Sequence, residues 1–224
     1  MSGAIAVFVK TPGLSPVKTR LAVKLGTQSA ENFHLLAANS VCSVVQDLSQ
    51  QADIQAYYAV AEQAALTHTY WQDLPCLWQG EGGLGERMAH IYQSLLNKHD
   101  FVLIVGADIP QMTCTELLKA EHWLADTSSK RLAFAPSADG GFWLFGGNCA
   151  IAMPLWTEVT YSAADTGVQF LNNIKPLGEL KHLAILRDVD EVSDLPLLQK
   201  SLLNLAQPTQ AQLKLMQYLR SFLE

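Results

Sequence analysis

The sequence lacks the features that mark secreted, membrane-spanning or metal-cluster proteins. Its four cysteines are scattered without a Cys-x-x-Cys pair, which indicates reduced thiols and no zinc-ligand set. No apolar run reaches the about 18 residues that a membrane span needs. The N-terminus has no basic segment before its first apolar run, so no signal peptide is expected. These absences predict a cytoplasmic protein without a membrane span.

An excess of basic residues is also missing. The net charge of −6 argues against a protein that binds nucleic acid or a membrane surface indiscriminately, although a local cationic site for phosphate is compatible with it. A hydrophobic content of 49% is ample for a large core. With no internal repeat, low-complexity run or linker in 224 residues, we expect residues 1–224 to form a single domain.

Several motifs of common enzymes are absent as well. The loop after the first apolar run contains neither the Walker pattern Gly-x-x-x-x-Gly-Lys-Ser/Thr nor Gly-x-Gly-x-x-Gly, which weakens a dinucleotide-dehydrogenase interpretation. No Gly-x-Ser-x-Gly elbow occurs. The six histidines have neither metal-ligand spacing nor a visible triad partner. Any activity must therefore come from other constellations.

What the chain does contain is an alternation of short apolar runs with amphipathic segments. Such alternation is typical of an α/β protein with a mostly parallel central sheet and helices on both faces. The predicted strands are 5–9, 54–60, 76–78, 101–105, 132–135, 142–145 and 180–186. The predicted helices are 29–48, 62–72, 86–96, 115–126, 162–173, 195–203 and 210–223.

The segment 106–110, Gly-Ala-Asp-Ile-Pro, organises the rest. It follows the apolar, β-branched run 101–105, so Asp108 lies just past the carboxyl end of a buried strand. Ligands of open α/β sheets collect in the crevice outside these strand ends. A carboxylate placed there suits Mg²⁺ on substrate phosphates, whereas the alternative is an aspartate that caps the loop.

Three cations, Lys10, Lys18 and Arg20, flank the Pro- and Gly-containing loop after the first strand. Backbone N–H groups before a helix attract anions, and Lys and Arg add charge to such a loop. Phosphate binding and a solvated basic loop are the two interpretations.

Two glycine-containing segments could wrap around a ligand. Segment 79–88 holds Gly83 and Gly85 before Arg87, and suits close contact with a base or sugar, or else a flexible turn. Asp139, Gly140 and Gly141 form a turn where the carboxylate could bind a ligand hydroxyl, or merely an Asx-type turn.

The late segment 188–190, Asp-Val-Asp, carries two carboxylates on the same side of an extended backbone. One of them could join Asp108 in clamping a divalent ion on a diphosphate or triphosphate, or the acidic residues could merely start the next helix. Trp156 is a candidate for lining an acceptor pocket.

In this order, the motifs resemble a known family. They are Phe8–Val9–Lys10, Val17–Lys18–Thr19–Arg20–Leu21, Leu84–Gly85–Glu86–Arg87–Met88, Gly106–Ala107–Asp108–Ile109–Pro110, 139–146 and Asp188–Val189–Asp190. The set resembles the bacterial GT-A-type transferases labelled glycosyltransferase or radical-SAM/selenodomain-associated transferase, within the nucleotide-diphospho-sugar transferase superfamily. The similarity spans residues 4 to 195. Departures from the family pattern are Ser15 for glycine, Gln111 for an acidic residue and Glu191 for threonine.

The resemblance implies a Rossmann-like GT-A fold, a nucleotide under the first loop, and Mg²⁺ or Mn²⁺ as cofactor. It assigns Lys18 and Arg20 to phosphate, with Lys10, Gly83, Gly85 and Arg87 near the nucleotide. It assigns Asp108 to the metal, and Asp139 and Asp190 to the same crevice, where Asp190 is our candidate for the second metal ligand. Asp139, Gly140, Gly141 and Trp156 would face the acceptor. The catalytic set would be Lys18, Arg20 and Asp108.

We therefore expect a metal-dependent transferase with a nucleotide donor, NTP or NDP-sugar, and a small-molecule acceptor. Sugar transfer is the leading version on family labelling, and nucleotidyl transfer to a phosphorylated acceptor, with pyrophosphate released, is the alternative. A non-catalytic nucleotide-binding protein is a third interpretation. A phosphatase is disfavoured, because its Asp-x-Asp motif would have to follow the first strand. Oligomerisation is left open by the sequence.

Overall fold

Seven strands form one sheet in the computed structural model, which describes residues 2–223. The strand order is β3-β2-β1-β4-β6-β5-β7, and within these residues only β6 runs antiparallel to its neighbours. The strands are β1 (Gly3–Val9), β2 (Ile54–Val60), β3 (Cys76–Trp78), β4 (Phe101–Gly106), β5 (Arg131–Pro136), β6 (Phe142–Gly147) and β7 (Glu179–His182). The predicted α/β fold with a mostly parallel sheet is confirmed.

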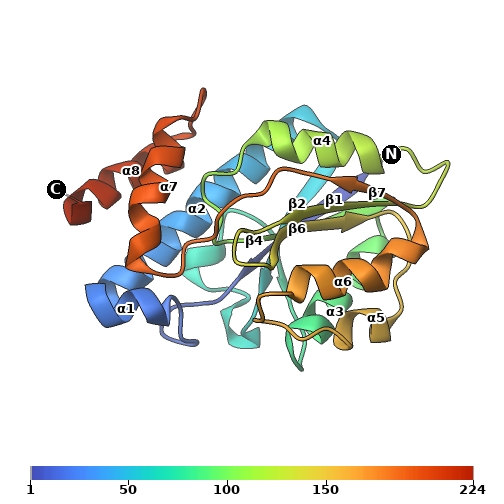
Figure 1. The fold of residues 1–224 in the computed structure, drawn as a ribbon, viewed down its shortest axis with the longest axis horizontal. Coiled ribbons are helices and arrows are strands. Elements are labelled where there is room, and N and C mark those ends of the chain that lie inside the picture. The colour runs from blue at the N-terminus through green and yellow to red at the C-terminus, as the bar shows by residue number, and fades with distance from the viewer. Residues whose placement is uncertain (1, 224) are drawn as a thin grey trace.

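Helices cover both faces of the sheet (Figure 1). Helices α2 and α4 pack on one face, and α3, α5 and α6 pack on the other. The helices are α1 (Thr19–Leu25), α2 (Thr27–Gln51), α3 (Leu84–Leu96), α4 (Cys114–Leu124), α5 (Met153–Thr157), α6 (Thr166–Ile174), α7 (Leu195–Leu203) and α8 (Gln210–Leu223).

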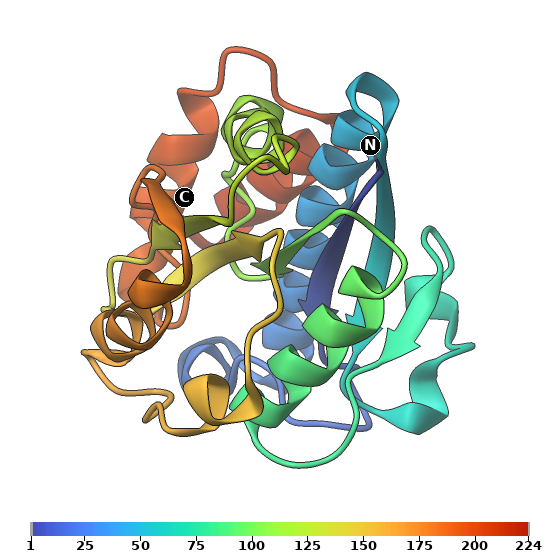
Figure 2. The same ribbon diagram turned by 90° about the vertical axis from the view of Figure 1, so that its right-hand side faces the viewer.

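The alternation of side chains along β1 accounts for this three-layer arrangement. Ile5 and Val7 belong to the apolar cluster beneath α2 and α4, whereas Ala4 and Ala6 belong to the cluster beneath α3. Successive side chains of a strand point to opposite faces, so a strand buried on both faces must be apolar throughout. In Figure 2, the dark-blue strand β1 lies between the blue helix α2 and the green helix α3.

The last two helices close the structure against its beginning. Residues of α1, α2, α7 and α8 form a third apolar cluster, in which Leu21, Phe33, Leu198 and Leu215 are buried. This cluster holds the segment before α7 beside the loop that precedes α1. The two ends of the chain thus contribute to one region.

The loops that follow β1, β4 and β5 leave the sheet at the same edge, because these three strands are parallel. Strand β1 pairs with β2 on one side and with β4 on the other. The chain therefore changes direction across the sheet between β1 and β4, and such switch points are where open α/β sheets bind ligands.

Some predicted elements differ from the observed ones. Segment 62–72 forms two short 3₁₀ turns, Gln63–Ala65 and Thr69–Trp71, rather than a helix. Strand β7 ends at His182, and the chain beyond it keeps a single bridge, from Leu186 to Ser137. Helices α1 and α5 were not expected, because five- to seven-residue helices carry too little periodicity to be recognised. None of the helices described within residues 2–223 has the length and apolar run needed to cross a bilayer.

Helix α8 supports the loop that carries Asp108 through one buried side chain. Gln212 Nε2 donates to the carbonyl oxygens of Pro110 (2.8 Å) and Met112 (3.1 Å). Its Oε1 accepts from Thr209 N–H at 2.9 Å. The Gln212 side chain therefore ties the C-terminal helix to the carboxyl end of β4.

Replacing Gln212 by methionine is expected to lower the free energy of unfolding by about 2–3 kcal/mol, because two buried carbonyls and one N–H lose their partner. Urea unfolding followed by circular dichroism measures the change. Gln210→Met on the same helix is the matched control, since Gln210 is exposed. Equal effects of the two substitutions would contradict this account of Gln212.

Candidate active site

The loop after β1 is fixed at its base. Thr11 N–H donates to both carboxylate oxygens of Glu62, and Thr11 Oγ1 accepts from the indole N–H of Trp71 at 2.9 Å. Gly13 then adopts a positive φ of 85°, a conformation that glycine takes without strain. These contacts begin the loop at a defined place, from which it leads to Lys18.

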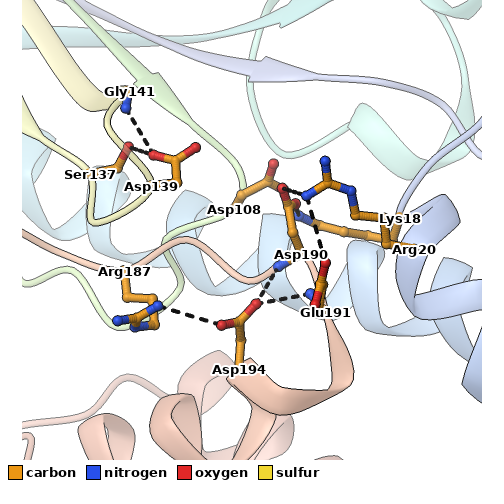
Figure 3. Close-up of polar contacts among 10 residues, drawn as sticks. All are labelled: Lys18, Arg20, Asp108, Ser137, Asp139, Gly141, Arg187, Asp190, Glu191 and Asp194. Carbon is orange, nitrogen blue, oxygen red and sulfur yellow. Dashed lines mark hydrogen bonds and ion pairs between the residues drawn. The ribbon is translucent and has the colours of Figure 1, made fainter. Parts of the chain in front are cut away.

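Lys18 is the centre of the site (Figure 3). Its Nζ donates to Asp108 Oδ1 at 2.9 Å and to Asp190 Oδ1 at 3.2 Å, and its side chain is only 4% exposed. Burial lowers the pKa of Lys18, but the charges of Asp108 and Asp190 outweigh this and hold it above its ordinary value. The Lys18 backbone lies in the left-handed region, at φ 45°, which costs a non-glycine residue about 1–2 kcal/mol. An ammonium held in this way is a fixed positive charge.

Asp108 follows β4 and faces the cleft. Burial raises the pKa of Asp108, but the Lys18 ammonium outweighs that effect and holds the pKa below its usual value. The side chains of Asp108 and Asp190 are 44% and 45% exposed, so both carboxylates remain accessible beyond their contact with Lys18. Both groups are therefore available to a ligand.

Asp190 is positioned by a network before α7. The Asp194 carboxylate accepts from the backbone N–H groups of Asp190 (3.1 Å) and Glu191 (2.9 Å), and it lies 3.7 Å from the guanidinium of Arg187. Gln111, just beyond Asp108, donates from Nε2 to the Arg187 carbonyl at 2.6 Å. This bond links the Asp108 loop to the segment of Asp190. A glutamate at position 111 would have no such proton to donate while ionised.

Arg20 lies at the rim. Its side chain is 69% exposed, and its guanidinium is 3.9 Å from both Asp190 and Glu191. A guanidinium with such loose partners can turn toward an anionic ligand at little cost.

The turn after β5 brings in Asp139. Its Oδ1 accepts from the Ser137 hydroxyl and from the Gly141 N–H, the latter at 2.9 Å, so the Asx-type turn, one of the two interpretations of this segment, is present. Gly140 has a φ of 94°, and a Cβ there would lie 1.8 Å from the Ala164 carbonyl oxygen. The turn is therefore seated directly on the segment before α6.

These residues line one cleft with a volume of about 760 Å³. Its charged lining consists of Lys10, Lys18, Arg20, Asp108, Asp139 and Asp190. A second cavity of about 310 Å³ adjoins it and shares Asp108 and Asp139 with it. The structure thus brings together the basic loop and the carboxylates that follow β4, β5 and β7.

Other candidates lie elsewhere. Trp156 is completely buried among Tyr92, Phe145 and Phe170, so the prediction that it lines an acceptor pocket is wrong. Gly85 packs against Trp156, because a Cβ there would be 2.5 Å from the Trp156 carbonyl oxygen.

The remaining members of the glycine-containing segment also have local partners. Gly83 N–H donates to the Glu86 carboxylate at 2.6 Å, and Arg87 Nε donates to the Gly82 carbonyl at 2.9 Å. Among the described residues of this segment, Gln79 and Leu84 line the cleft, whereas Gly83, Gly85 and Arg87 do not. The close contact expected of Gly83, Gly85 and Arg87 with a ligand is therefore not supported by their position.

One residue of the site, His34, had not been singled out by the motifs, and another, Asp188, had been considered only as an alternative to Asp190 for the metal. His34 on α2 lines the cleft, and its Nε2 donates to the Lys10 carbonyl at 2.9 Å. Burial lowers the pKa of His34, although the charge of Asp108 opposes the effect. Asp188 lines the second cavity, where burial, and then the charges of Asp139 and Asp190, raise its pKa to about 6. Nothing in the sequence distinguishes His34 from the other polar positions of α2.

The sheet order and the position of the cleft define an open α/β fold with its ligand cleft at the β1–β4 switch point. The chain belongs to the family described as "Uncharacterized protein conserved in bacteria (DUF2064)", whose model matches residues 42–163, more than half of the chain. Lys18 and Asp190 lie outside the matched residues.

Solved structures share the fold. A protein from Desulfovibrio desulfuricans G20, provisionally named a nucleotide-diphospho-sugar transferase, matches 99% of both chains with a TM-score of 0.85 and 23% identity. A CMP:2-keto-3-deoxy-manno-octonic acid synthetase complexed with CTP matches 88% of this chain and 96% of that chain, with a TM-score of 0.53 and 7% identity. A cytidylyltransferase from Leptospira borgpetersenii serovar Hardjo-bovis matches 99% and 95%, with a TM-score of 0.51 and 9% identity. A search of curated proteins finds no match.

Proposed function

We propose that this protein is a divalent-cation-dependent transferase that acts on a nucleotide donor. The observation that carries the proposal is the contact of one buried ammonium, Lys18, with two accessible carboxylates, Asp108 and Asp190, in the cleft at the switch point of the sheet. Buried charges that meet in a cleft from distant segments are typical of functional sites. The similar fold of a synthetase complexed with CTP supports a nucleotide as ligand of this cleft.

The donor would bind with its phosphates against the loop after β1. Lys10, Lys18 and Arg20 supply positive charge along that loop, and Arg20 is free to offer two parallel N–H groups to a phosphate. The cleft volume of about 760 Å³ lies within the range of about 300–1,000 Å³ that small-molecule sites occupy. The net charge of the chain is negative, so this loop is a local exception that favours an anionic ligand.

The carboxylates of the site suit a metal ion that is shared with the substrate. Within residues 2–223, no group of three or more His, Cys, Asp or Glu side chains is arranged to hold a metal ion. Mg²⁺ is commonly held by one or two carboxylates together with substrate phosphates and water. Asp108 and Asp190 would supply these carboxylates, and the bound cation would neutralise charge on phosphate oxygens. The Lys18 ammonium, which now satisfies both groups, would shift toward the phosphates.

The reaction needs no nucleophile from the protein. In sugar transfer, an acceptor oxygen bonds to the anomeric carbon while the bond from that carbon to the phosphate oxygen breaks. The nucleoside diphosphate leaves with the electron pair, and the acceptor proton passes to solvent or to a nearby carboxylate. Lys18 and Arg20 would stabilise the negative charge that develops on the leaving phosphate. Positioning and electrostatics would supply most of the rate acceleration.

Nucleotidyl transfer is the second candidate, because two of the proteins with a similar fold are named as cytidylyl-type transferases or synthetases. There the acceptor attacks the α-phosphate of an NTP and pyrophosphate leaves. A panel of NTPs and NDP-sugars with Mg²⁺ or Mn²⁺, read by thermal shift, identifies the donor, because a ligand of the native state raises the melting temperature. Release of nucleoside diphosphate would then indicate sugar transfer, and release of pyrophosphate would indicate nucleotidyl transfer.

Replacing Asp108 by asparagine is expected to lower turnover of the identified donor by about 10³-fold and to abolish the dependence of donor binding on Mg²⁺. Steady-state kinetics and titration calorimetry with and without Mg²⁺ measure both effects. Glu158→Gln, an exposed carboxylate at the end of α5, is the matched control and should change neither. If the nucleotide bound equally well with and without Mg²⁺ and no turnover occurred, the proposal of an enzyme would be refuted. The protein would then be a non-catalytic nucleotide-binding protein.

A further inference from the structure

The second cavity differs from the cleft in its chemistry. Its volume of about 310 Å³ is at the lower end of the range for small-molecule sites. Its wall is largely apolar and contains the aromatic side chains of Phe8, Phe142 and Trp143. Phe8, Leu84, Asp108 and Asp139 line both spaces, so a molecule in this cavity would lie against one in the cleft.

The cavity has negative charge and no positive charge of its own. Among the described residues that line it there is no lysine, arginine or histidine, but there are three carboxylates, Asp108, Asp139 and Asp188. In Figure 3, the Asp139 side chain lies on the turn after β5, apart from the Lys18 cluster. Lys18, which neutralises Asp108, forms ion pairs with Asp108 and Asp190 and lines only the cleft.

Three of the four side-chain hydroxyl groups of the wall donate to acceptors within the protein, and the fourth belongs to Ser162. Tyr161 Oη donates to the Trp156 carbonyl at 2.8 Å, and Thr166 Oγ1 donates to the Thr160 carbonyl at 2.8 Å. The Ser137 hydroxyl donates to Asp139. The side chains of the wall therefore offer a ligand mainly carboxylate oxygens as hydrogen-bond acceptors, and few of the O–H donors that a phosphate needs.

We propose that this second cavity is the acceptor subsite, and that it selects neutral or cationic hydroxyl or amine compounds with an apolar body over phosphorylated ones. The inference rests on the proposed function, because it assigns the cleft to the donor. A phosphate in this cavity would exchange water for a wall of like charge, which disfavours its binding. An ammonium or hydroxyl group would donate to the same carboxylates.

The selectivity would persist with a divalent cation on Asp108. Such an ion carries two positive charges, whereas the cavity wall holds three carboxylates, so the wall would not become positive. Nucleotidyl transfer onto a phosphorylated acceptor is therefore disfavoured, and transfer onto a hydroxyl or amine is favoured.

Three probes with one aromatic body test the inference: phenethylamine, 2-phenylethanol and phenethyl phosphate. Each is titrated into the full-length protein, and its dissociation constant is read from the amide NMR signals of residues that line this cavity and not the cleft, such as Gly141 and Trp143. We expect the amine and the alcohol to bind, and the phosphate to bind at least about tenfold more weakly than the alcohol. A phosphate that binds as tightly as the alcohol, or no binding by amine and alcohol up to their solubility limits, would overturn the proposal.

Variants show whether the carboxylates cause the preference. The double substitution Asp139→Asn and Asp188→Asn should raise the affinity ratio of phosphate to alcohol about tenfold, since asparagine at 139 can still accept the Ser137 and Gly141 bonds. Glu158→Gln should leave the ratio unchanged. Leu84→Lys, at the exposed start of α3, adds a cation to the wall that the cavity shares with the cleft. It should raise the affinity ratio of phosphate to alcohol without altering the turn that carries Asp139. An unchanged ratio in both charge variants would refute the electrostatic cause.

Failure of this inference is separable from failure of the proposed function. A nucleotide that binds with Mg²⁺ while the phosphate probe outcompetes the alcohol would refute the acceptor class alone. Absence of any nucleotide binding would refute the proposed function, whatever the order of the three probes.

Discussion

Lys18→Met is expected to lower turnover of the nucleotide donor by about 10²–10³-fold, the usual cost of removing one group that stabilises developing charge. The same substitution should tighten Mg²⁺ binding in the absence of nucleotide by about tenfold. The reason is that the ammonium holds Asp108 and Asp190 at 2.9 and 3.2 Å, and methionine fills its buried place without competing for the two carboxylates. The two effects have opposite directions, which a general loss of structure would not produce.

Steady-state kinetics and Mg²⁺ titration by calorimetry measure the pair of effects. Arg20→Met is the control at the rim of the same site: its exposed side chain contacts Asp190 only at 3.9 Å, so Mg²⁺ affinity should change little. Its donor affinity should still fall, because the guanidinium is free to contact phosphate. If Lys18→Met weakened Mg²⁺ binding, the proposed competition between ammonium and metal would be refuted.

Gly140→Ala is expected to lower the free energy of unfolding by about 3 kcal/mol or more. A Cβ at this position would lie 1.8 Å from the Ala164 carbonyl oxygen, and φ is 94°. The backbone of the turn or of the segment before α6 would have to move, which adds to the conformational cost of a side chain at positive φ. Urea unfolding measures the change, and the displaced Asp139 should also reduce turnover.

Gly13→Ala separates the conformational cost of a side chain at positive φ from the cost of the steric contact with Ala164. Gly13 has a similar φ of 85°, but a Cβ there would have no heavy atom within 4 Å. Its expected cost is therefore only the conformational part, about 1 kcal/mol. Equal losses at positions 13 and 140 would mean that the contact with Ala164 contributes nothing.

The predicted site residues differ in whether their place has a local cause in the sequence. Asp108 follows an apolar run long enough for a buried strand, so its place at the sheet edge follows from nearby residues alone. Lys18 and Asp190 required the order of several motifs, because nothing local indicates that residues 172 positions apart share a hydrogen bond. The alternation that places Asp188 and Asp190 on the same side could not say which cavity each would reach.

The parts that the sequence missed depend on distant packing. The sequence predicted that Gly85 would contact a ligand. In the structure, the Trp156 carbonyl of α5 packs against Gly85 instead. Trp156 itself is buried by aromatic rings from α3, β6 and α6. The sequence pattern around residue 156 does not predict these distant contacts. His34 lines the cleft because its turn of α2 packs beside the Lys10 carbonyl, to which His34 Nε2 donates.

The bond between Lys18 and Asp190 has a consequence for synthesis on the ribosome. Both partners of Lys18 follow it in the sequence, Asp190 by 172 positions, and domains form as translation proceeds from the N-terminus. A nascent chain that already contains β1 and β4 can bring Lys18 to Asp108, but it still lacks the segment that completes the cation's surroundings. The proposed site would consequently stay incomplete until the segment around Asp190 has been synthesised.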